Sequence, residues 1–177
     1  MSDTGTAKYH VLASRLRECI AKGEWDPGEK LPPRRQLQES LGVSSITVQR
    51  AFDSLIDEGF VVPRGPRGTF VSPRPPCRYR YGLVFDREPD GWGWSRFFET
   101  IKKQAHAIES DGHSSFKMYF GAGGHRDQRA TRDLFNDLRQ NKLAGVILSR
   151  NIPGSGEWPV WSETNIPGVV IQSSPTH

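Results

Sequence analysis

The sequence predicts a small α+β domain followed by part of an α/β domain with a parallel sheet. In the first 75 residues, apolar positions recur at helical spacing and are followed by two short β-prone runs around a turn. After residue 80, Val/Ile-rich strand patterns alternate with helical patterns. Between them, SPRPPCRYR (72–80) holds three prolines and three arginines, which is typical of an extended linker. We therefore expect domains at 1–75 and 81–177.

Helical patterns come first along the chain. Apolar residues at four-residue spacing predict a helix over about 7–22, and a second, short helix is expected over about 34–40, ended by Gly42. Ser44 is a good N-cap for a third helix, because its hydroxyl can accept a backbone N–H of the first turn. This third helix should bury Val48, Ala51, Phe52, Leu55 and Ile56.

The next segment, FVVPRGPRGTFV, predicts a small hairpin with a basic tip. Two helices joined by a tight glycine turn and followed by such a hairpin form a winged helix-turn-helix. The second helix of this motif enters the DNA major groove N-terminus first, and small hydroxyl groups allow close approach. The candidate DNA contacts are Ser44, Ser45, Thr47, Gln49 and Arg50 on this helix, and Arg64 and Arg67 on the hairpin.

The charge distribution supports an anionic partner for the first domain. Residues 1–80 hold 13 Lys/Arg and 9 Asp/Glu, a net charge of +4, whereas residues 81–177 hold 11 of each kind. The whole basic excess therefore lies in the half of the chain that carries the helix-turn-helix pattern.

From residue 9 to residue 71 the sequence resembles the GntR family of bacterial transcriptional regulators. The resemblance covers GEWDPGEKLPPRRQL, LGVSSITVQRAFDSLIDEGFV and RGTFV, in the order and spacing of that family. It implies that Arg35 reads a guanine and that Gly68 is the wing glycine. It also implies a double-stranded DNA operator bound by a homodimer on an inverted repeat.

The sequence also departs from this family. Ser45 and Gln49 stand where the family often has arginine, and Pro66 stands where it often has glycine. Because glutamine favours adenine edges over guanine, the resemblance implies DNA binding but leaves the operator sequence open.

In the second half, strand patterns are RYGLVFD, SFKMYF, LAGVILS and IPGVVIQSS, with helical patterns at 95–112 and 126–142. Ligands of parallel sheets bind at the loops after the strands. The first such loop carries Asp86, Arg87, Trp92, Trp94 and Ser95, which suit stacking and hydrogen bonding to a sugar-like effector. The alternative is that the tryptophans cover the sheet edge or a partner surface.

This order of elements resembles the start of the effector domain of LacI-type regulators and periplasmic sugar-binding proteins. Joined to a GntR-type domain, it resembles arabinose-type repressors. That fold has two lobes, and only about 95 residues follow the linker here. We therefore expect a truncated frame or a fragment, with weak or no effector response.

Composition argues against several other classes. An apolar signal region and a membrane-length apolar run are both missing, which predicts a cytoplasmic protein. Cys19 and Cys77 fit no metal spacing, and we expect no metal, no cofactor and no enzyme activity. The predicted function is a sequence-specific transcriptional regulator, acting as a repressor. The alternatives are a DNA-binding fragment without ligand response and, less favoured, an enzyme fused to a DNA-binding domain.

Overall fold

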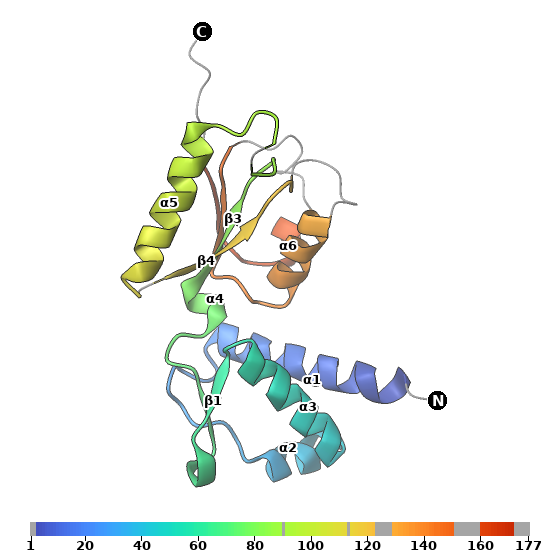
Figure 1. Ribbon diagram of the computed structural model, residues 1–177. Helices are drawn as coiled ribbons and strands as arrows, with labels where there is room; N and C mark the ends of the chain where they lie inside the picture. Colours follow the sequence, from blue (N-terminus) through green and yellow to red (C-terminus); the bar gives the residue numbers. More distant parts are fainter. Residues whose placement is uncertain (1–2, 90, 113, 123–128, 151–159, 172–177) are drawn as a thin grey trace. The chain divides into compact units, whose positions relative to one another are not determined.

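The structure, a computed structural model, describes residues 3–89, 91–112, 114–122, 129–150 and 160–171 (Figure 1). The chain divides into two compact units, Met1–Arg78 and Tyr79–His177, which we call the first and second domains. Within the described residues, every helix is too short or too polar to cross a membrane.

The first domain is built on α1 (Asp3–Lys22), α2 (Arg34–Leu41) and α3 (Ser45–Asp57). α1 begins several residues before the predicted start. Gly42 ends α2 in the left-handed conformation, with φ of 62°, and its N–H bonds the Gln38 carbonyl. A residue with a Cβ is strained there, so this glycine produces the tight turn that joins α2 to α3.

The core of the first domain lies between α1 and α3. It contains Leu12, Leu16, Ile20, Val48, Ala51, Phe52 and Leu55, and Ile56 packs against it while remaining partly exposed. Arg17 on α1 is 2% exposed and forms an ion pair of 2.8 Å with Glu58 just after α3. This pair ties the two helices together at the edge of the core.

The predicted hairpin is present as β1 (Val61–Pro63) and β2 (Thr69–Val71), joined through the turn η1 (Gly65–Arg67). A segment from the loop before α2 runs along the other side of β2. The Leu31 N–H donates to the Thr69 carbonyl at 2.9 Å, and Lys30 pairs with Phe70. The wing is therefore anchored on both sides of β2.

Residues 72–80 are not the extended linker that the sequence predicts. Residues Pro76–Tyr79 form the short helix α4, and Cys77 packs against the core of the first domain. Pro75 and Pro76 are buried. The prolines restrict the backbone dihedral angles and bury apolar surface. Composition alone therefore overestimated the conformational freedom of this segment.

The second domain contains a parallel sheet with strand order β4-β3-β5-β6. β3 (Arg80–Val84) pairs with β4 (Ser115–Tyr119) and with β5 (Gly145–Leu148), and β5 also pairs with β6 (Gly168–Val170). The predicted parallel α/β arrangement is confirmed. The crossover from β3 to β4 and the next one, from β4 to β5, run in opposite directions across the sheet, so the direction changes between β3 and β5.

Helices cover both faces of this sheet (Figure 1). α5 (Arg96–Ser110) packs on the face that presents Leu83, Phe85 and Ile147, and α6 (Arg129–Arg139) on the face that presents Val84, Val146 and Leu148. Alternate residues of one strand thus enter different cores, as expected for a two-sided parallel sheet.

A few bounds differ from those predicted. α6 is shorter than the predicted 126–142, of which 126–128 lie outside the described residues, and the short helix α7 (Val160–Glu163) precedes β6. The last strand was predicted over 166–174, and residues 172–174 of it lie outside the described part.

Candidate nucleic-acid interface

The N-terminal end of α3 exposes small polar side chains. Ser44, Ser45 and Arg50 are exposed, and Ile46 beside them is 58% exposed. Thr47 differs, because it is 5% exposed and its hydroxyl lies 2.8 Å from that of Ser44. The structure thus places Ser44 and Ser45 at an accessible helix end and leaves Arg50 exposed further along α3, whereas Thr47 contributes to packing and capping.

Ser44 caps α3 as the sequence predicts. Its backbone is extended, with φ of −71° and ψ of 157°, and its Oγ accepts the Thr47 N–H at 3.3 Å. One of the unpaired N–H groups of the first turn is satisfied in this way. The same hydroxyl would serve both as the cap of α3 and in any contact with DNA.

Gln49 is held at both ends of its side-chain amide. Its Oε1 accepts a hydrogen bond from the Arg34 guanidinium, and its Nε2 donates to Asp53 Oδ1 at 2.7 Å. The Arg34 guanidinium carbon lies 4.9 Å from the centre of the Phe52 ring. This chain of contacts connects the first residue of α2 to the middle of α3.

The first turn of α2 also carries Arg35. Its side chain is 87% exposed, and its Nε donates to Glu39 Oε1 at 2.9 Å, one turn along the same helix. Exposed ion pairs of this kind are weak. The guanidinium can therefore leave Glu39 for a stronger partner at little cost.

The wing carries the predicted basic tip. The Arg64 guanidinium carbon lies 4.6 Å from the centre of the Phe70 ring, and Arg67 ends the η1 turn. Gly68 has φ of 103°, and a Cβ there would lie 2.9 Å from Lys30 Cε. Glycine is therefore favoured here by the backbone conformation, whether or not it contacts DNA.

An open groove runs between the wing and the start of α2. Three basic side chains line it, from Lys30, Arg34 and Arg67, and its described lining contains no Asp or Glu. Arg50 instead lines a different hollow, together with Asp53, Asp57 and Glu58. The positive potential of the interface is therefore concentrated beside the wing.

In the second domain, charged residues meet at the ends of β3 and β5. Asp86 Oδ2 lies 3.3 Å from Arg87 Nε and 3.4 Å from Arg150 Nη1. Among the described residues, Asp86 Oδ1 and the fully buried Ser149 hydroxyl have no hydrogen-bond partner. Asp86 and Arg87 line an open crevice after β3, and Arg150 reaches Asp86 from the end of β5.

The two tryptophans of the predicted effector loop have different positions. Trp92 is 93% exposed, with the Arg87 guanidinium carbon 5.5 Å from its ring centre. Trp94 packs between Phe85 and Phe120, and its Nε1 donates to Glu99 on α5 at 3.3 Å. The prediction of an exposed indole is therefore wrong for Trp94, which covers the sheet as the alternative proposed.

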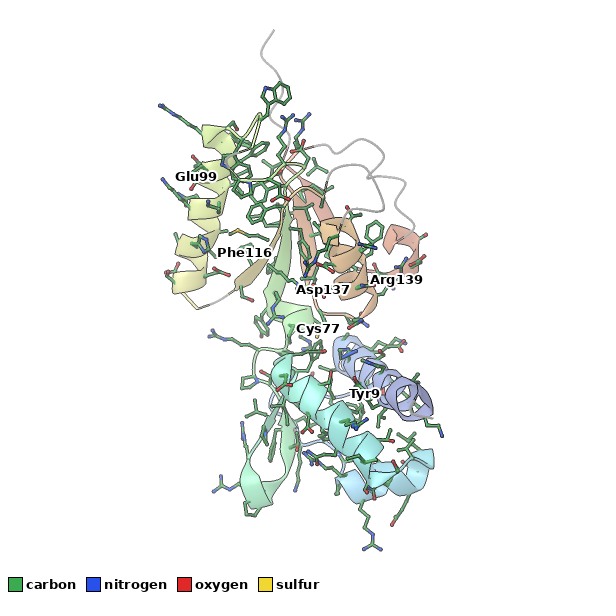
Figure 2. All side chains as sticks on the ribbon, turned by 45° about the vertical axis from the view of Figure 1, so that its right-hand side comes forward. Tyr9, Cys77, Glu99, Phe116, Asp137 and Arg139 are labelled. Carbon is green, nitrogen blue, oxygen red and sulfur yellow. The ribbon has the colours of Figure 1, made fainter. Side chains whose placement is uncertain are left out.

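Glu99 and Asp137 illustrate how polar groups hold the two helices of this domain (Figure 2). Hydrogen bonds from Lys102 and then Trp94 lower the pKa of Glu99. On the other face, Tyr119 Oη donates to Asp137 Oδ2 at 2.5 Å, and burial followed by this hydrogen bond raises the pKa of Tyr119. These contacts are structural, and neither lies in the crevice.

Sequence reasoning missed three of these residues. The predicted DNA contacts do not include Arg34, because the GntR resemblance implies a role for its neighbour Arg35 only. Both are basic residues at the start of a helix. Arg150 and Ser149 follow the third strand pattern. The sequence does not give the strand order, and that order brings Arg150 to Asp86.

Comparison with known proteins agrees with the geometry of the first domain. Residues 8–71 match the model of the bacterial regulatory proteins of the gntR family. The helix-turn-helix-type transcriptional regulator YdcR of Escherichia coli (strain K12) is 40% identical over 67 residues, which cover 38% of this chain and 14% of that protein. The repressor MngR of the mannosyl-D-glycerate transport/metabolism system, from the same strain, is 40% identical over 63 residues, covering 36% and 26%.

Among solved structures, the AraR DNA-binding domain in complex with operator ORR3 is 29% identical and covers 37% of this chain and 78% of that one, with a TM-score of 0.36. This chain spans less than a third of the length of either curated relative. The similarity to those relatives is confined to the segment that holds the helix-turn-helix and its wing. Residues 8–71 of this chain therefore match the gntR family of bacterial regulatory proteins, and the match falls on the helix-turn-helix and wing described above.

Proposed function

We propose that this chain is a sequence-specific transcriptional regulator that acts as a repressor by binding an operator in duplex DNA. The carrying observation is the accessible N-terminus of α3, where Ser44 and Ser45 are exposed, in the same domain as a groove whose charged lining residues, among those described, are all basic. Small hydroxyls suit close approach to base edges, and the guanidinium groups suit phosphate. Two copies are proposed to bind the two halves of an inverted repeat.

Binding to DNA is tested with the full chain and a randomised 30-base-pair duplex pool, followed by selection of bound sequences. We expect one enriched palindromic sequence and an affinity that falls steeply with salt, with a slope of about −0.9 per phosphate contacted. An affinity that stays constant between low and high salt, or a selected pool without enrichment, would contradict the proposal.

We further propose that the second domain is a lobe similar to those of periplasmic sugar-binding proteins and takes a sugar-like effector. Support comes from Asp86, whose carboxylate faces Arg87 and Arg150, from the Ser149 hydroxyl, which has no hydrogen-bond partner in the described part of the chain, and from the exposed ring of Trp92. Hydroxyl groups of a sugar pair with carboxylate and guanidinium groups, and its apolar face stacks on an indole. Ser95 lies at the start of α5 on the same loop.

Titration with pentoses, hexoses and sugar phosphates by calorimetry tests this assignment. The assignment predicts that one class of ligand binds the second domain, and the weak or absent effector response expected from the sequence predicts little change in affinity for the selected duplex. Asp86→Asn should weaken that binding, whereas Glu109→Gln at the far end of α5 should leave it unchanged. If no ligand class binds, the effector assignment fails while DNA binding is unaffected.

A further inference from the structure

Arg34 and Gln49 form a connected pair between α2 and α3, and their geometry differs from what base reading by Gln49 requires. To read adenine, glutamine offers its amide oxygen and nitrogen together to one base edge. In this structure the oxygen accepts from Arg34, and the nitrogen donates to Asp53 at 2.7 Å. Both partners are charged, and hydrogen bonds to charged groups are about twice as strong as neutral ones. Turning the amide toward a base would break both.

Arg34 is held in place by two contacts. Gln49 accepts one of its N–H groups, and the face of the guanidinium lies over Phe52, with 4.9 Å between the guanidinium carbon and the ring centre. A guanidinium has five N–H donors, so several donors remain after this contact. An arginine fixed in this way loses little conformational freedom when it binds an anion.

The groove beside Arg34 has the electrostatic character of a phosphate site. Lys30 and Arg67 line it with Arg34, and the other described lining residues are uncharged. Lys30 crosses Gly68, where a Cβ would approach its Cε to 2.9 Å. The groove lies between the wing and the start of α2, and Phe52 of α3 also lines it, so it belongs to the winged helix-turn-helix that the proposed function places on DNA.

We propose that Arg34 contacts a DNA phosphate, that the basic groove of Lys30, Arg34 and Arg67 receives the DNA backbone, and that Gln49 is a positioning residue for Arg34 and does not read a base. This inference rests on the proposed DNA binding. It makes Arg34 a contact absent from the sequence-predicted set, and it gives Gln49 a different role within that set.

The test compares three variants of the full chain, Arg34→Met, Gln49→Ala and the double variant, with the parent chain. Methionine keeps an apolar stem over Phe52 and removes the charge. Affinity is measured on the selected duplex and on random duplex at several salt concentrations. Arg34→Met should lose about tenfold in affinity on both duplexes, and the steepness of its salt dependence should fall by about 0.9.

Gln49→Ala should show a smaller loss of the same uniform kind, with an unchanged selected sequence. Because Gln49 acts through Arg34, the double variant should bind no more weakly than Arg34→Met alone. Arg15→Met is the matched control: it removes one exposed charge from α1, on the far side of the domain from the wing tip (Figure 1). It should leave the affinity for the selected duplex close to that of the parent.

Distinct results would overturn the inference. Altered preference at one base pair in Gln49→Ala would make Gln49 a base reader. A drop in thermal stability and affinity of Arg34→Met with an unchanged salt slope would make Arg34 a purely structural link. If the parent chain binds no duplex at all, the proposed function fails as well, whereas salt-dependent binding unaffected by Arg34→Met refutes this inference alone.

Discussion

At the residue scale, the side chains of the candidate interface differ in how strongly they are bonded within the protein itself. Arg35 holds Glu39 in an exposed pair, whereas Gln49 is held between two charged partners and Ser44 is used as a cap. Weakly paired groups are available to DNA, and strongly paired ones organise their neighbours. The role of a residue in such a domain therefore depends on what it already bonds.

The resemblance-based role of Arg35 can be tested directly. Arg35→Ala should weaken binding to the selected duplex by about 1–3 kcal/mol, because a bidentate contact with guanine is lost. Preference at one base position should flatten while binding to random duplex changes little. A uniform loss on all sequences would instead make Arg35 a phosphate contact. Arg74→Ala, which removes an exposed arginine after the wing, is the control.

The two cysteines provide a second residue-scale prediction. Burial raises the pKa of Cys77 to about 11, and burial followed by a hydrogen bond with Glu24 raises that of Cys19 to about 11. Both thiols should therefore react slowly with a disulfide reagent at pH 8 and rapidly after unfolding.

The raised thiol pKa values also affect stability. Because the folded state favours the neutral thiols, their contribution is fully present below about pH 9 and is lost as the pH rises to about 11. The free energy of unfolding should fall over that range, and less so in Cys77→Ala. Fast reaction of both thiols in the native chain would contradict the raised pKa values.

At the element scale, α3 depends on its N-terminal cap and the wing depends on its anchoring along β2. Ser44 bonds the Thr47 N–H, and the segment with Lys30 and Leu31 bonds the wing strand. Neither element is stabilised by its own few residues alone. The accessible end of α3 and the basic groove are consequences of these local contacts.

Ser44→Ala should therefore destabilise the first domain by about 1 kcal/mol through loss of the cap. Ser44→Asp restores the cap and places a negative charge at the DNA-facing end, so it should recover stability while weakening DNA binding. Thermal unfolding and DNA titration of the same samples measure the two effects. Equal affinity of Ser44→Asp and the parent would show that this helix end does not approach phosphate.

At the scale of the whole molecule, the cores of the two domains are separate. The predicted DNA contacts lie within the first domain, and among the described residues its core cluster ends at Cys77. The second domain buries its own residues on both faces of the sheet. Base preference should therefore be encoded by the first domain alone.

We expect residues 1–78, expressed separately, to fold with a helical spectrum and to select the same DNA sequence as the full chain. The reason is that each contact and its supporting contacts come from this segment. Selection from the randomised pool with both proteins measures this. A different selected sequence would show that the second domain contributes to readout.

The sequence by itself determined most of the elements of this protein, with the short helices α4 and α7 as exceptions. Local signals were sufficient for the Ser44 cap, the Gly42 turn, the hairpin and the alternation of strands and helices, because capping, backbone conformation and hydrophobic periodicity act over a few residues. The basic excess and the GntR resemblance located the DNA-binding domain, because both can be read from one continuous segment of the sequence.

Only the tertiary structure decided which side chains meet. Trp94 packs on the sheet because Phe85 and Phe120, which follow two neighbouring strands, converge on it. Arg34 reached Gln49 across 15 residues, and Arg150 reached Asp86 through the strand order. Such contacts depend on how elements pack, and side-chain spacing along one element carries no record of them.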